Sequence, residues 1–346
     1  MKMIGLILAG GGSPVREMSQ KATAALPVAG GFNAIDFSLS CMVHAGITSV
    51  AVISQVNSRH LNHHLKDSTW WDFGRKKGGL FLISPVVTPE NQSWYDGTVE
   101  ALLDAVDFMD SCHEPYVIIA SGDGVYNMDF DKALDYHIEK GAEITIITAG
   151  FPAGRRTESF GQVKADGNGQ VLSLSEKISE RVSDDVSCGI YILRRRALIS
   201  MLEEARLAGK KDFVTDVICP RIGDGRVYAY RHEGYWNSVT AADAYFSCNM
   251  DFLRPEVREE VFNGPSPILS KVCDTAPVKL LGDANVQNCV VTGGAVIAGE
   301  VADSVVFERV KIGKGAVVRN SILLPNTVVP EGMHVQDCIY AEKPRY

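Results

Sequence analysis

The sequence predicts an α/β domain with a mixed, mostly parallel sheet, followed by a smaller domain built as a parallel β-helix. Three observations carry this prediction. Short apolar strand patterns alternate with helical patterns up to residue 261. A segment rich in proline and glycine then interrupts the chain, and from residue 279 onward aliphatic side chains recur every six residues.

The first strand is expected over residues 3–9, an unbroken apolar run that ends at Gly10-Gly11-Gly12. Apolar runs of this length that are bounded by glycine are typical of buried parallel strands. Runs of the same character lie at 48–54, 80–84, 116–121 and 144–149. Strands that alternate with helices indicate βαβ units and a mostly parallel sheet.

One helical pattern between these strands is clear, because Val99, Leu102, Val106 and Met109 fall on a single stripe and predict a helix over 97–109. Farther along, the β-rich segments 160–164 and 171–175 flank Asp166-Gly167-Asn168-Gly169. Such a turn sequence predicts an antiparallel hairpin, and the sheet is therefore expected to be mixed.

The domain boundary is expected at Phe262-Asn263-Gly264-Pro265-Ser266-Pro267, since these prolines and the glycine cannot continue a helix. We expect a first domain over 1–261, a linker over 262–278 and a second domain over 279–346. The aliphatic column of the second domain comprises three runs with this spacing, which are Val291 and Ile297, then Val306, Ile312 and Val318, then Leu323, Val329 and Val335; one step of five residues, from Val318 to Leu323, interrupts the period. A repeat of six residues is the signature of a β-helix whose stacked coils bury this column.

Composition excludes several classes of function. The chain has 346 residues, is 46% hydrophobic and 22% charged, and carries a formal charge of −8, which argues against binding to nucleic acid. No apolar run is long enough to span a bilayer and the start lacks the features of a signal peptide, so we expect a cytoplasmic protein without a membrane partner.

The cysteines and a histidine cluster are expected to be structural. Eight cysteines lie far apart and are most simply small buried apolar side chains (Cys41, Cys112, Cys188, Cys219, Cys248, Cys273, Cys289 and Cys338). His60, His63 and His64 have a spacing that could bind a metal on a helix. Because no acidic or cysteine partner sits near them in the sequence, we expect exposed or capping histidines instead.

The glycines after the first strand point to a phosphate ligand. Backbone N–H groups and a helix N-terminus face an anion at such a turn, and glycine allows its close approach. A glycine-rich turn alone is weak support, and neither a G-x-G-x-x-G nor a Walker pattern is present.

Several segments, taken together in chain order, indicate one protein family far more specifically than the glycine-rich turn does. They are Leu8-Ala9-Gly10-Gly11, Leu26-Pro27, Gly30-Gly31, residues 35–40, Trp94-Tyr95-Asp96-Gly97-Thr98, residues 121–129, Glu176-Lys177, Ser187-Cys188-Gly189-Ile190-Tyr191, Asp212-Phe213, Gly234-Tyr235-Trp236, Asp243-Ala244-Tyr245 and Asn249-Met250-Asp251. The set resembles the ADP-glucose pyrophosphorylase (glucose-1-phosphate adenylyltransferase) family along nearly the whole chain. Within the family, the pattern is most similar to the D-type subunit of Gram-positive bacteria, which is regulatory and catalytically degenerate.

The resemblance implies a Rossmann-like nucleotidyltransferase domain and a left-handed hexapeptide-repeat β-helix. It also implies the reaction of ATP with α-D-glucose 1-phosphate, which gives ADP-glucose for glycogen synthesis and releases pyrophosphate. Mg²⁺ would be held by carboxylates, of which Asp123 matches the first. The implied nucleotide-binding residues are Leu8, Ala9, Gly10, Gly11 and Gly122, and the implied sugar-phosphate-binding residues are Tyr95, Gly161, Glu176, Lys177 and Ser187.

The chain departs from the family pattern where the pattern supplies charge. The loop from Gly11 to Pro27 is two residues shorter than in active members, and Pro14 removes a backbone donor from it. Thr23 replaces a lysine, Asn237 an arginine, and Ser238 the second magnesium carboxylate. A hydroxyl is a poor ligand for Mg²⁺ compared with a carboxylate. Arg16 is a candidate substitute for the loop arginine that is missing.

Three hypotheses follow. The first is a subunit with little or no activity alone, which modulates a catalytic paralogue in a mixed tetramer. The second is a self-sufficient adenylyltransferase in which Arg16, Lys21 or a repositioned carboxylate rescues the site. The third is a sugar-phosphate binding or acyl-transfer protein of the hexapeptide class, although the β-helix is short and contains no histidine before His334. Family effectors are anions bound near the domain interface, where Arg309 and Arg319 are possible contacts.

Overall fold

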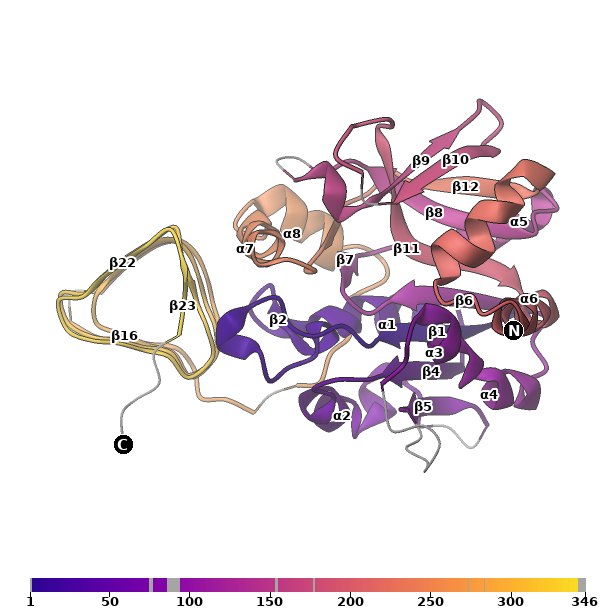
Figure 1. The fold of residues 1–346 in the computed structure, drawn as a ribbon. Coiled ribbons are helices and arrows are strands. Elements are labelled where there is room, and N and C mark those ends of the chain that lie inside the picture. The colour runs from indigo at the N-terminus through magenta and orange to yellow at the C-terminus, as the bar shows by residue number, and fades with distance from the viewer. Residues whose placement is uncertain are drawn as a thin grey trace.

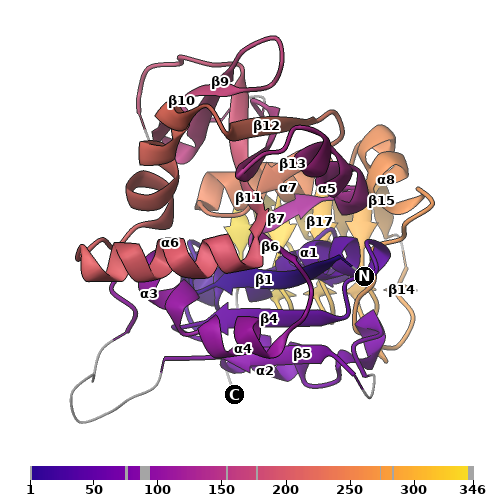
Figure 2. The ribbon, with the colours of Figure 1, turned by 90° about the vertical axis from the view of Figure 1, so that its right-hand side faces the viewer.

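A mixed sheet forms the centre of the first domain. The computed structural model describes residues 2–74, 77–85, 94–152, 155–176, 178–272, 274–282 and 284–341. In spatial order the sheet consists of β10 (Val171–Glu176), β9 (Gly161–Ala165), β11 (Asp185–Arg194), β6 (Tyr116–Ser121), β1 (Met3–Ala9), β4 (Ser49–Ser54) and β5 (Gly79–Ile83), while β8 (Ile144–Gly150) pairs with β11 and with β12 (Val227–His232). Strands β6, β1, β4 and β5 run parallel to one another and are seen in this order in Figure 2.

Helices cover both faces of this sheet. Side chains of β1 alternate between two apolar clusters, because successive residues of a strand point to opposite faces. Met3 and Ile7 pack with α1 (Ala34–His44), α2 (Arg59–Leu65) and α5 (Phe130–Glu139), whereas Ile4 and Leu6 pack with α3 (Thr98–Leu103), α4 (Val106–Ser111) and α6 (Arg195–Leu207). Burial on both faces explains why the central strands β1, β4 and β6 are apolar runs and do not alternate with polar residues.

The helix predicted over 97–109 is two helices, α3 and α4. The break lies at Ala105, whose φ of −90° and ψ of 2° leave the α region. Val99, Leu102 and Met109 are nevertheless all buried, since both short helices turn the same stripe toward the sheet. The hairpin predicted around Asp166-Gly167-Asn168-Gly169 is confirmed, because β9 and β10 pair in antiparallel fashion on either side of it.

Two small ribbons and two helices complete the first domain. The ribbon of β7 (Gly124–Tyr126) and β13 (Trp236–Ser238) lies close to the carboxyl end of β6, and a second ribbon joins β2 (Pro27–Val28) to β3 (Phe32–Asn33). Helices α7 (Ala242–Asp251) and α8 (Pro255–Phe262) precede the linker. Figure 1 shows both helices on the side of the domain that faces the β-helix.

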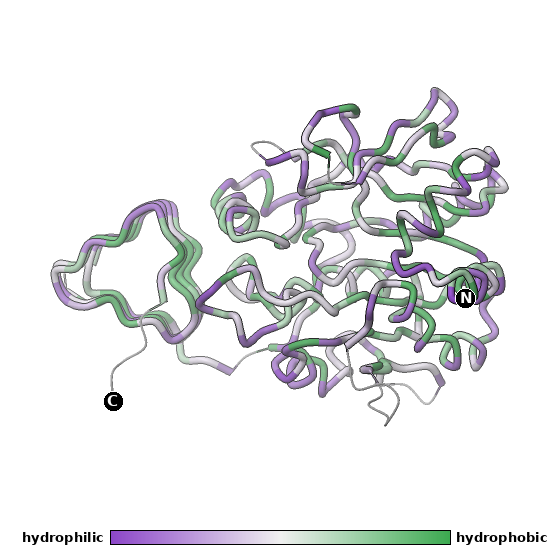
Figure 3. The backbone as a smooth tube through the Cα atoms, viewed as in Figure 1, coloured by the Kyte–Doolittle hydropathy of each residue, from purple (hydrophilic) through white to green (hydrophobic). Residues whose placement is uncertain are grey.

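The C-terminal part is a β-helix of parallel strands, as predicted. One column of pairs contains β14 (Lys279–Leu280), β16 (Val296–Ile297), β18 (Lys311–Ile312) and β21 (Val328–Val329). The other sheet contains β15 (Asn285–Val291), β17 (Glu300–Val306), β19 (Val317–Arg319), β20 (Ile322–Leu323), β22 (His334–Gln336) and β23 (Ile339–Tyr340). Ile297 pairs with Ile312 and Ile312 with Val329, and the predicted aliphatic column is buried inside the stacked coils except for Val291, which is only partly buried. Figure 3 shows that equivalent positions of successive coils have similar hydropathy.

The corners of the coils need left-handed backbone. Asn288, Asp303, Asn320 and Asp337 all have positive φ and occupy equivalent corners. Asparagine and aspartate tolerate this conformation better than other residues with a side chain. Their side chains also stack, because the Asn288 amide donates to Asp303 at 2.6 Å and the Asn320 amide donates to Asp337 at 2.6 Å.

The two parts of the chain share one apolar cluster. Val305, Phe307, Ile322 and Leu324 of the β-helix pack with side chains of α7, α8 and β2. At Gly30, a Cβ atom would lie 2.8 Å from a methyl carbon of Val290, and φ is +89°. Glycine at position 30 is therefore required both by the backbone conformation and by the approach of the β-helix.

Candidate functional site

Most of the predicted nucleotide-binding residues meet at one edge of the sheet. Leu8 pairs with Ser121 in the parallel β1–β6 ladder, so the turns that follow both strands lie side by side. The Gly122 N–H donates to the Leu8 carbonyl at 2.9 Å. A Cβ at Gly122 would lie 3.1 Å from the Ala24 side chain, which explains the need for glycine. The structure thus brings Gly122 and Asp123 beside the run from Leu8 through Ala9 and Gly10 to Gly11.

Asp123 is the carboxylate at this edge. Its Oδ1 accepts a hydrogen bond from the Ser121 hydroxyl at 2.8 Å. Burial raises the pKa of Asp123, and the hydrogen bond from Ser121 opposes that rise only in part. The Asp123 carbonyl accepts from the Val239 N–H at 3.1 Å, which joins this turn to the strand that carries the departures from the family pattern.

The loop after the first strand closes on itself through Thr23. The Thr23 side chain is only 5% exposed, and its hydroxyl donates to the Gly12 carbonyl at 2.8 Å while its N–H donates to Gly11 at 2.9 Å. Gly12 also forms a bridge with Ala22. Several backbone N–H groups of the loop are used internally, namely those of Ser13, Val15, Met18, Ser19, Lys21 and Thr23. The sequence shows that Thr23 lacks a charge, but only the structure shows that its hydrogen bonds hold the two ends of the loop together.

The two candidate rescuing cations lie elsewhere in this region. Arg16 is exposed on the short helical turn Arg16–Met18. Lys21 instead lines a cavity between the two domains, where burial lowers its pKa and Glu308 opposes that shift.

Ser238 and Asn237 lie beside the Asp123 turn, because β13 pairs with β7 and Ser238 faces Gly124. Both side chains are buried. An arginine that the sequence did not single out reaches them, since Arg155 Nη1 donates to Asn237 Oδ1 at 3.0 Å and lies 3.4 Å from the Ser238 carbonyl oxygen. No local pattern could have indicated this contact, as the two positions are 82 residues apart.

These residues do not fit Mg²⁺. The ion requires oxygen ligands in near-octahedral geometry, and carboxylates supply the protein's share. The site offers the Asp123 carboxylate, but Ser238 carries a hydroxyl, which lies 3.4 Å from the Thr240 hydroxyl. In the described part of the chain, no group of three or more His, Cys, Asp or Glu side chains could hold a metal ion.

Three of the predicted sugar-side residues also come together. Gly161 and Glu176 are cross-strand partners in the β9–β10 hairpin, and a Cβ at Gly161 would collide with the Glu176 carboxylate. Val186 pairs with Gln162, which places Ser187 near Gly161. The Ser187 hydroxyl accepts from the Gly189 N–H at 3.2 Å and lies 3.3 Å from the Tyr191 hydroxyl.

Of the other two sugar-side residues, Tyr95 lies before α3, where its hydroxyl donates to Asp104 at 2.8 Å. Burial, followed by this hydrogen bond, raises the pKa of Tyr95. Lys177 lies outside the described residues.

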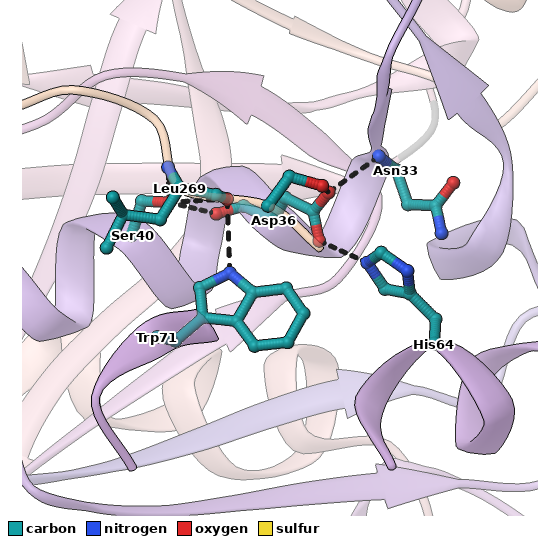
Figure 4. A network of polar contacts seen from close by, with 7 residues as sticks. Asn33, Asp36, Ser40, His64, Trp71 and Leu269 are labelled. Carbon is teal, nitrogen blue, oxygen red and sulfur yellow. Dashed lines mark hydrogen bonds and ion pairs between the residues drawn. The ribbon is translucent and has the colours of Figure 1, made fainter. Parts of the chain in front are cut away.

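The histidine cluster corrects one expectation. His64 does have an acidic partner, because its Nε2 lies 2.6 Å from Oδ1 of the buried Asp36, which is 28 residues away in sequence and on α1 (Figure 4). The other oxygen of Asp36 accepts from the Asn33 N–H at 2.8 Å and from the Ser270 hydroxyl at 2.6 Å. Sequence proximity could not reveal a partner contributed by a different helix.

This polar network also holds the linker on α1. The Leu269 N–H donates to the Ser40 hydroxyl at 2.8 Å, and the Leu269 carbonyl accepts from the Trp71 indole at 3.1 Å (Figure 4). Next to it lies a cavity of about 670 Å³ between the domains, whose basic and imidazole side chains are Lys21, His60, His63, His64, Lys271 and Arg309. Arg319, in contrast, pairs with Glu300 of the β-helix at 3.6 Å.

Seven of the eight cysteines lie in the described part of the chain. Cys41, Cys112, Cys188 and Cys248 are buried, and the described cysteines are free thiols. Cys273 lies outside the described residues. Among the helices that the structure describes, none is both long enough and apolar enough to cross a membrane.

Comparisons with known proteins agree with this architecture. Residues 4–254 match the Nucleotidyl transferase family, and residues 278–344 match the GlmU-like, C-terminal hexapeptide family. A Clostridium perfringens glucose-1-phosphate adenylyltransferase is 31% identical over 95% of this chain and 86% of its own length. Proteins of the same name from Mycoplasma mobile and Clostridium beijerinckii are 33% and 34% identical, over 92% and 93% of this chain and over 85% and 84% of their own lengths.

Proposed function

Because the chain belongs to the glucose-1-phosphate adenylyltransferase family of nucleotidyl transferases, we propose that it is a subunit for ADP-glucose synthesis in glycogen biosynthesis. It would have weak or no activity alone and would modulate a catalytic paralogue in a mixed tetramer. ATP or ADP-glucose and glucose 1-phosphate are the expected ligands.

The observation that carries this proposal is the loss of charge at two buried positions of the site, Thr23 and Ser238. In the family reaction an oxygen of the sugar phosphate attacks the α-phosphorus of ATP, and pyrophosphate leaves. The protein must position two polyanions and neutralise the charge that develops on the leaving group. A buried threonine and a buried serine supply no positive charge and no metal carboxylate for this step.

The sugar side supports retained ligand binding. Gly161, Glu176 and Ser187 lie on adjacent strands, and Gly161 leaves room for the Glu176 side chain. This arrangement is what a subunit would need to bind the sugar phosphate without carrying out the transfer. We therefore propose that this chain still binds the sugar phosphate, although it catalyses little or no transfer.

The interdomain cavity supports a regulatory role. Arg309 comes from the β-helix, whereas Lys21 and His63 come from the first domain, and all three line the same space. An anion bound there would contact both domains, and its binding could thereby affect a partner subunit. Following the resemblance, we propose Arg309, and not Arg319, as an effector contact.

The decisive experiment measures pyrophosphate release from ATP and glucose 1-phosphate. The pure chain should give little or no product. When it is mixed with a catalytic paralogue, it should change the rate or the effector response of that paralogue. A normal rate from the pure chain would favour the self-sufficient enzyme and overturn the regulatory assignment.

The acyl-transfer alternative has a separate readout, which is consumption of acetyl-CoA. Its candidate base, His334, is exposed on β22. Consumption of acetyl-CoA that is lost in His334→Ala would establish this alternative.

A further inference from the structure

The cavity between the domains carries imidazoles as well as lysine and arginine side chains. Lys21 comes from the loop after β1, Lys271 from the linker and Arg309 from the β-helix. His60 and His63, both exposed on α2, line the same space of about 670 Å³. Such an array attracts anions, and its total charge changes with pH because an unperturbed imidazole titrates at about pH 6.5.

Positive charge surrounds these two imidazoles. Burial lowers the pKa of His60, and the positive charge of Lys21 lowers it further. Arg59 and His63 act in the same direction. Among the described residues that line the cavity, Glu308 is the only acidic side chain, and it acts on Lys21, whose pKa is lowered by burial. Positive neighbours therefore oppose protonation of the imidazoles, and a bound anion would reverse that effect.

His64, the third imidazole of the cavity, is already paired. Its Nε2 lies 2.6 Å from Oδ1 of the buried Asp36 (Figure 4), so a charge on this ring is compensated by the carboxylate. The other oxygen of Asp36 accepts from the hydroxyl of Ser270, which belongs to the linker. The imidazoles that can add uncompensated charge to the cavity are therefore His60 and His63.

We propose that His60 and His63 make anion binding in this cavity depend on pH, so that the anion is bound together with protons and more tightly in mildly acidic solution. The inference deepens the effector role in the proposed function and rests on it for the biological meaning of the site. A protonated imidazole donates a charge-assisted hydrogen bond to an anion, and a neutral one brings no charge. The gain in affinity is complete below the pKa of the imidazoles in the free protein. It is lost as pH rises through their higher pKa in the complex.

The experiment uses sulfate as its probe, because sulfate keeps two charges between pH 6 and pH 8, whereas a phosphate group titrates at about pH 6. The full-length protein is titrated with sodium sulfate by isothermal calorimetry at pH 6.0 and at pH 8.0, at constant ionic strength. Buffers of different ionisation enthalpy at pH 7.0 count the protons that are taken up. We expect proton uptake, and binding at least about fivefold tighter at pH 6.0 than at pH 8.0, which one imidazole would supply if its pKa rose by about one in the complex.

Three variants separate the imidazoles from the other cations. The double variant His60→Gln, His63→Gln keeps side chains that donate hydrogen bonds but do not titrate, so its sulfate affinities at the two pH values should become nearly equal. Arg309→Gln should weaken binding at both pH values and preserve their ratio. His113→Gln is the matched control, because His113 is exposed and does not line this cavity, and it should behave like the wild type.

Three results would overturn the proposal. One is equal affinity of the wild type for sulfate at both pH values, and another is a pH dependence that survives in the double histidine variant. The third is unchanged binding by Arg309→Gln, which would place the sulfate outside this cavity. Because only sulfate is added, these results do not depend on ATP, the sugar phosphate or a partner subunit. Absence of any effect on a catalytic paralogue would overturn the proposed function and leave this inference standing.

Discussion

Thr23 and Ser238 decide together how the candidate site can be repaired. A charge placed at such a site is typically worth a few kcal/mol of transition-state stabilisation. Thr23 is buried and clasps the loop, so Thr23→Lys brings a charge but breaks the hydrogen bond to Gly12. Ser238→Asp brings a carboxylate to a buried position on β13, the strand that pairs with β7 after the Asp123 turn.

We therefore expect repair of activity to need both changes. The double variant Thr23→Lys, Ser238→Asp should release pyrophosphate at least about tenfold faster than the wild type, in the presence of MgCl₂. The matched control, Thr23→Gln with Ser238→Asn, introduces side chains of similar size without charge. Equal rates for the double variant and the control would show that the shortened loop, not the missing charges, limits the reaction.

His137 makes stability depend on pH. The ring is fully buried, Nδ1 lies 2.8 Å from the Thr145 hydroxyl, and burial lowers the pKa to about 4 with a smaller contribution from Arg194. The unfolded chain binds a proton near pH 6.5 and the folded chain does not, so folding stability falls as pH drops from 6.5 toward 4. At about 1.4 kcal/mol per pKa unit, the loss approaches roughly 3 kcal/mol.

His137→Phe should flatten this part of the stability curve, because phenylalanine can keep the edge contact with the Tyr116 ring without titrating. Urea denaturation between pH 7 and pH 4.5 measures the slope. His113→Phe is the control, as His113 is exposed on the surface. A slope unchanged by His137→Phe would assign the acid sensitivity to other groups.

The sequence predicts where the candidate site lies but not the partners of its residues. The family resemblance picks out Leu8 to Gly11, Gly122 and Asp123 in short motifs at the ends of strands, and the parallel β1–β6 pairing brings these ends together. Arg155 and the Asp36–His64 pair were missed, since each contact joins residues far apart in sequence without a repeating pattern.

At the scale of elements, burial on both faces made the central strands easy to predict. β1 follows the expected range from Met3 to Ala9, and β6 follows the range 116–121. The apolar stripe from Val99 to Met109 correctly predicted a buried helical face. The prediction of one continuous helix was wrong, because the segment forms two short helices. Apolar periodicity records which face is buried, and a break of two residues such as Asp104-Ala105 leaves it almost unchanged.

Asp36 fixes the start of α1 and the path of the linker. Its carboxylate accepts from the Asn33 N–H, the Ser270 hydroxyl and His64, and it is completely buried. Asp36→Ala removes a cap and leaves several buried donors unpaired, so we expect a loss of about 2–4 kcal/mol in the free energy of unfolding. The midpoint of urea denaturation measures it.

The control for this element is Asp67→Ala. Asp67 also accepts a hydrogen bond from the start of a helical turn, through the Thr69 N–H, but it lies on the surface. Its replacement should move the urea midpoint much less than Asp36→Ala. Equal shifts for the two variants would mean that the network around Asp36 adds nothing beyond an ordinary cap.

At the scale of the whole molecule, the repeat of six residues predicted the coils but could not show how they meet the first domain. Residues that recur every six positions line the inside of the β-helix. Phe307 and Leu324 fall outside that column, and both pack in the cluster shared with α7, α8 and β2. Docking therefore depends on side chains that the repeat does not specify.

Phe307 tests whether the two parts unfold together. It is 1% exposed and packs in the shared cluster with Val28, Phe37 and Tyr245. Phe307→Ala should cost about 3–5 kcal/mol, because it leaves a cavity at the junction of the two domains. Because side chains of both domains form this cluster, we expect calorimetry to show one transition, shifted as a whole to lower temperature.

Leu280→Ala is the control, since Leu280 belongs to the β-helix but is 58% exposed, and its loss should leave the transition almost unchanged. Two separate transitions in Phe307→Ala, with only the β-helix transition displaced, would contradict the prediction. The domains would then be independent bodies in contact. A single displaced transition would instead show that the two domains unfold as one cooperative unit, the condition that regulation through the junction requires.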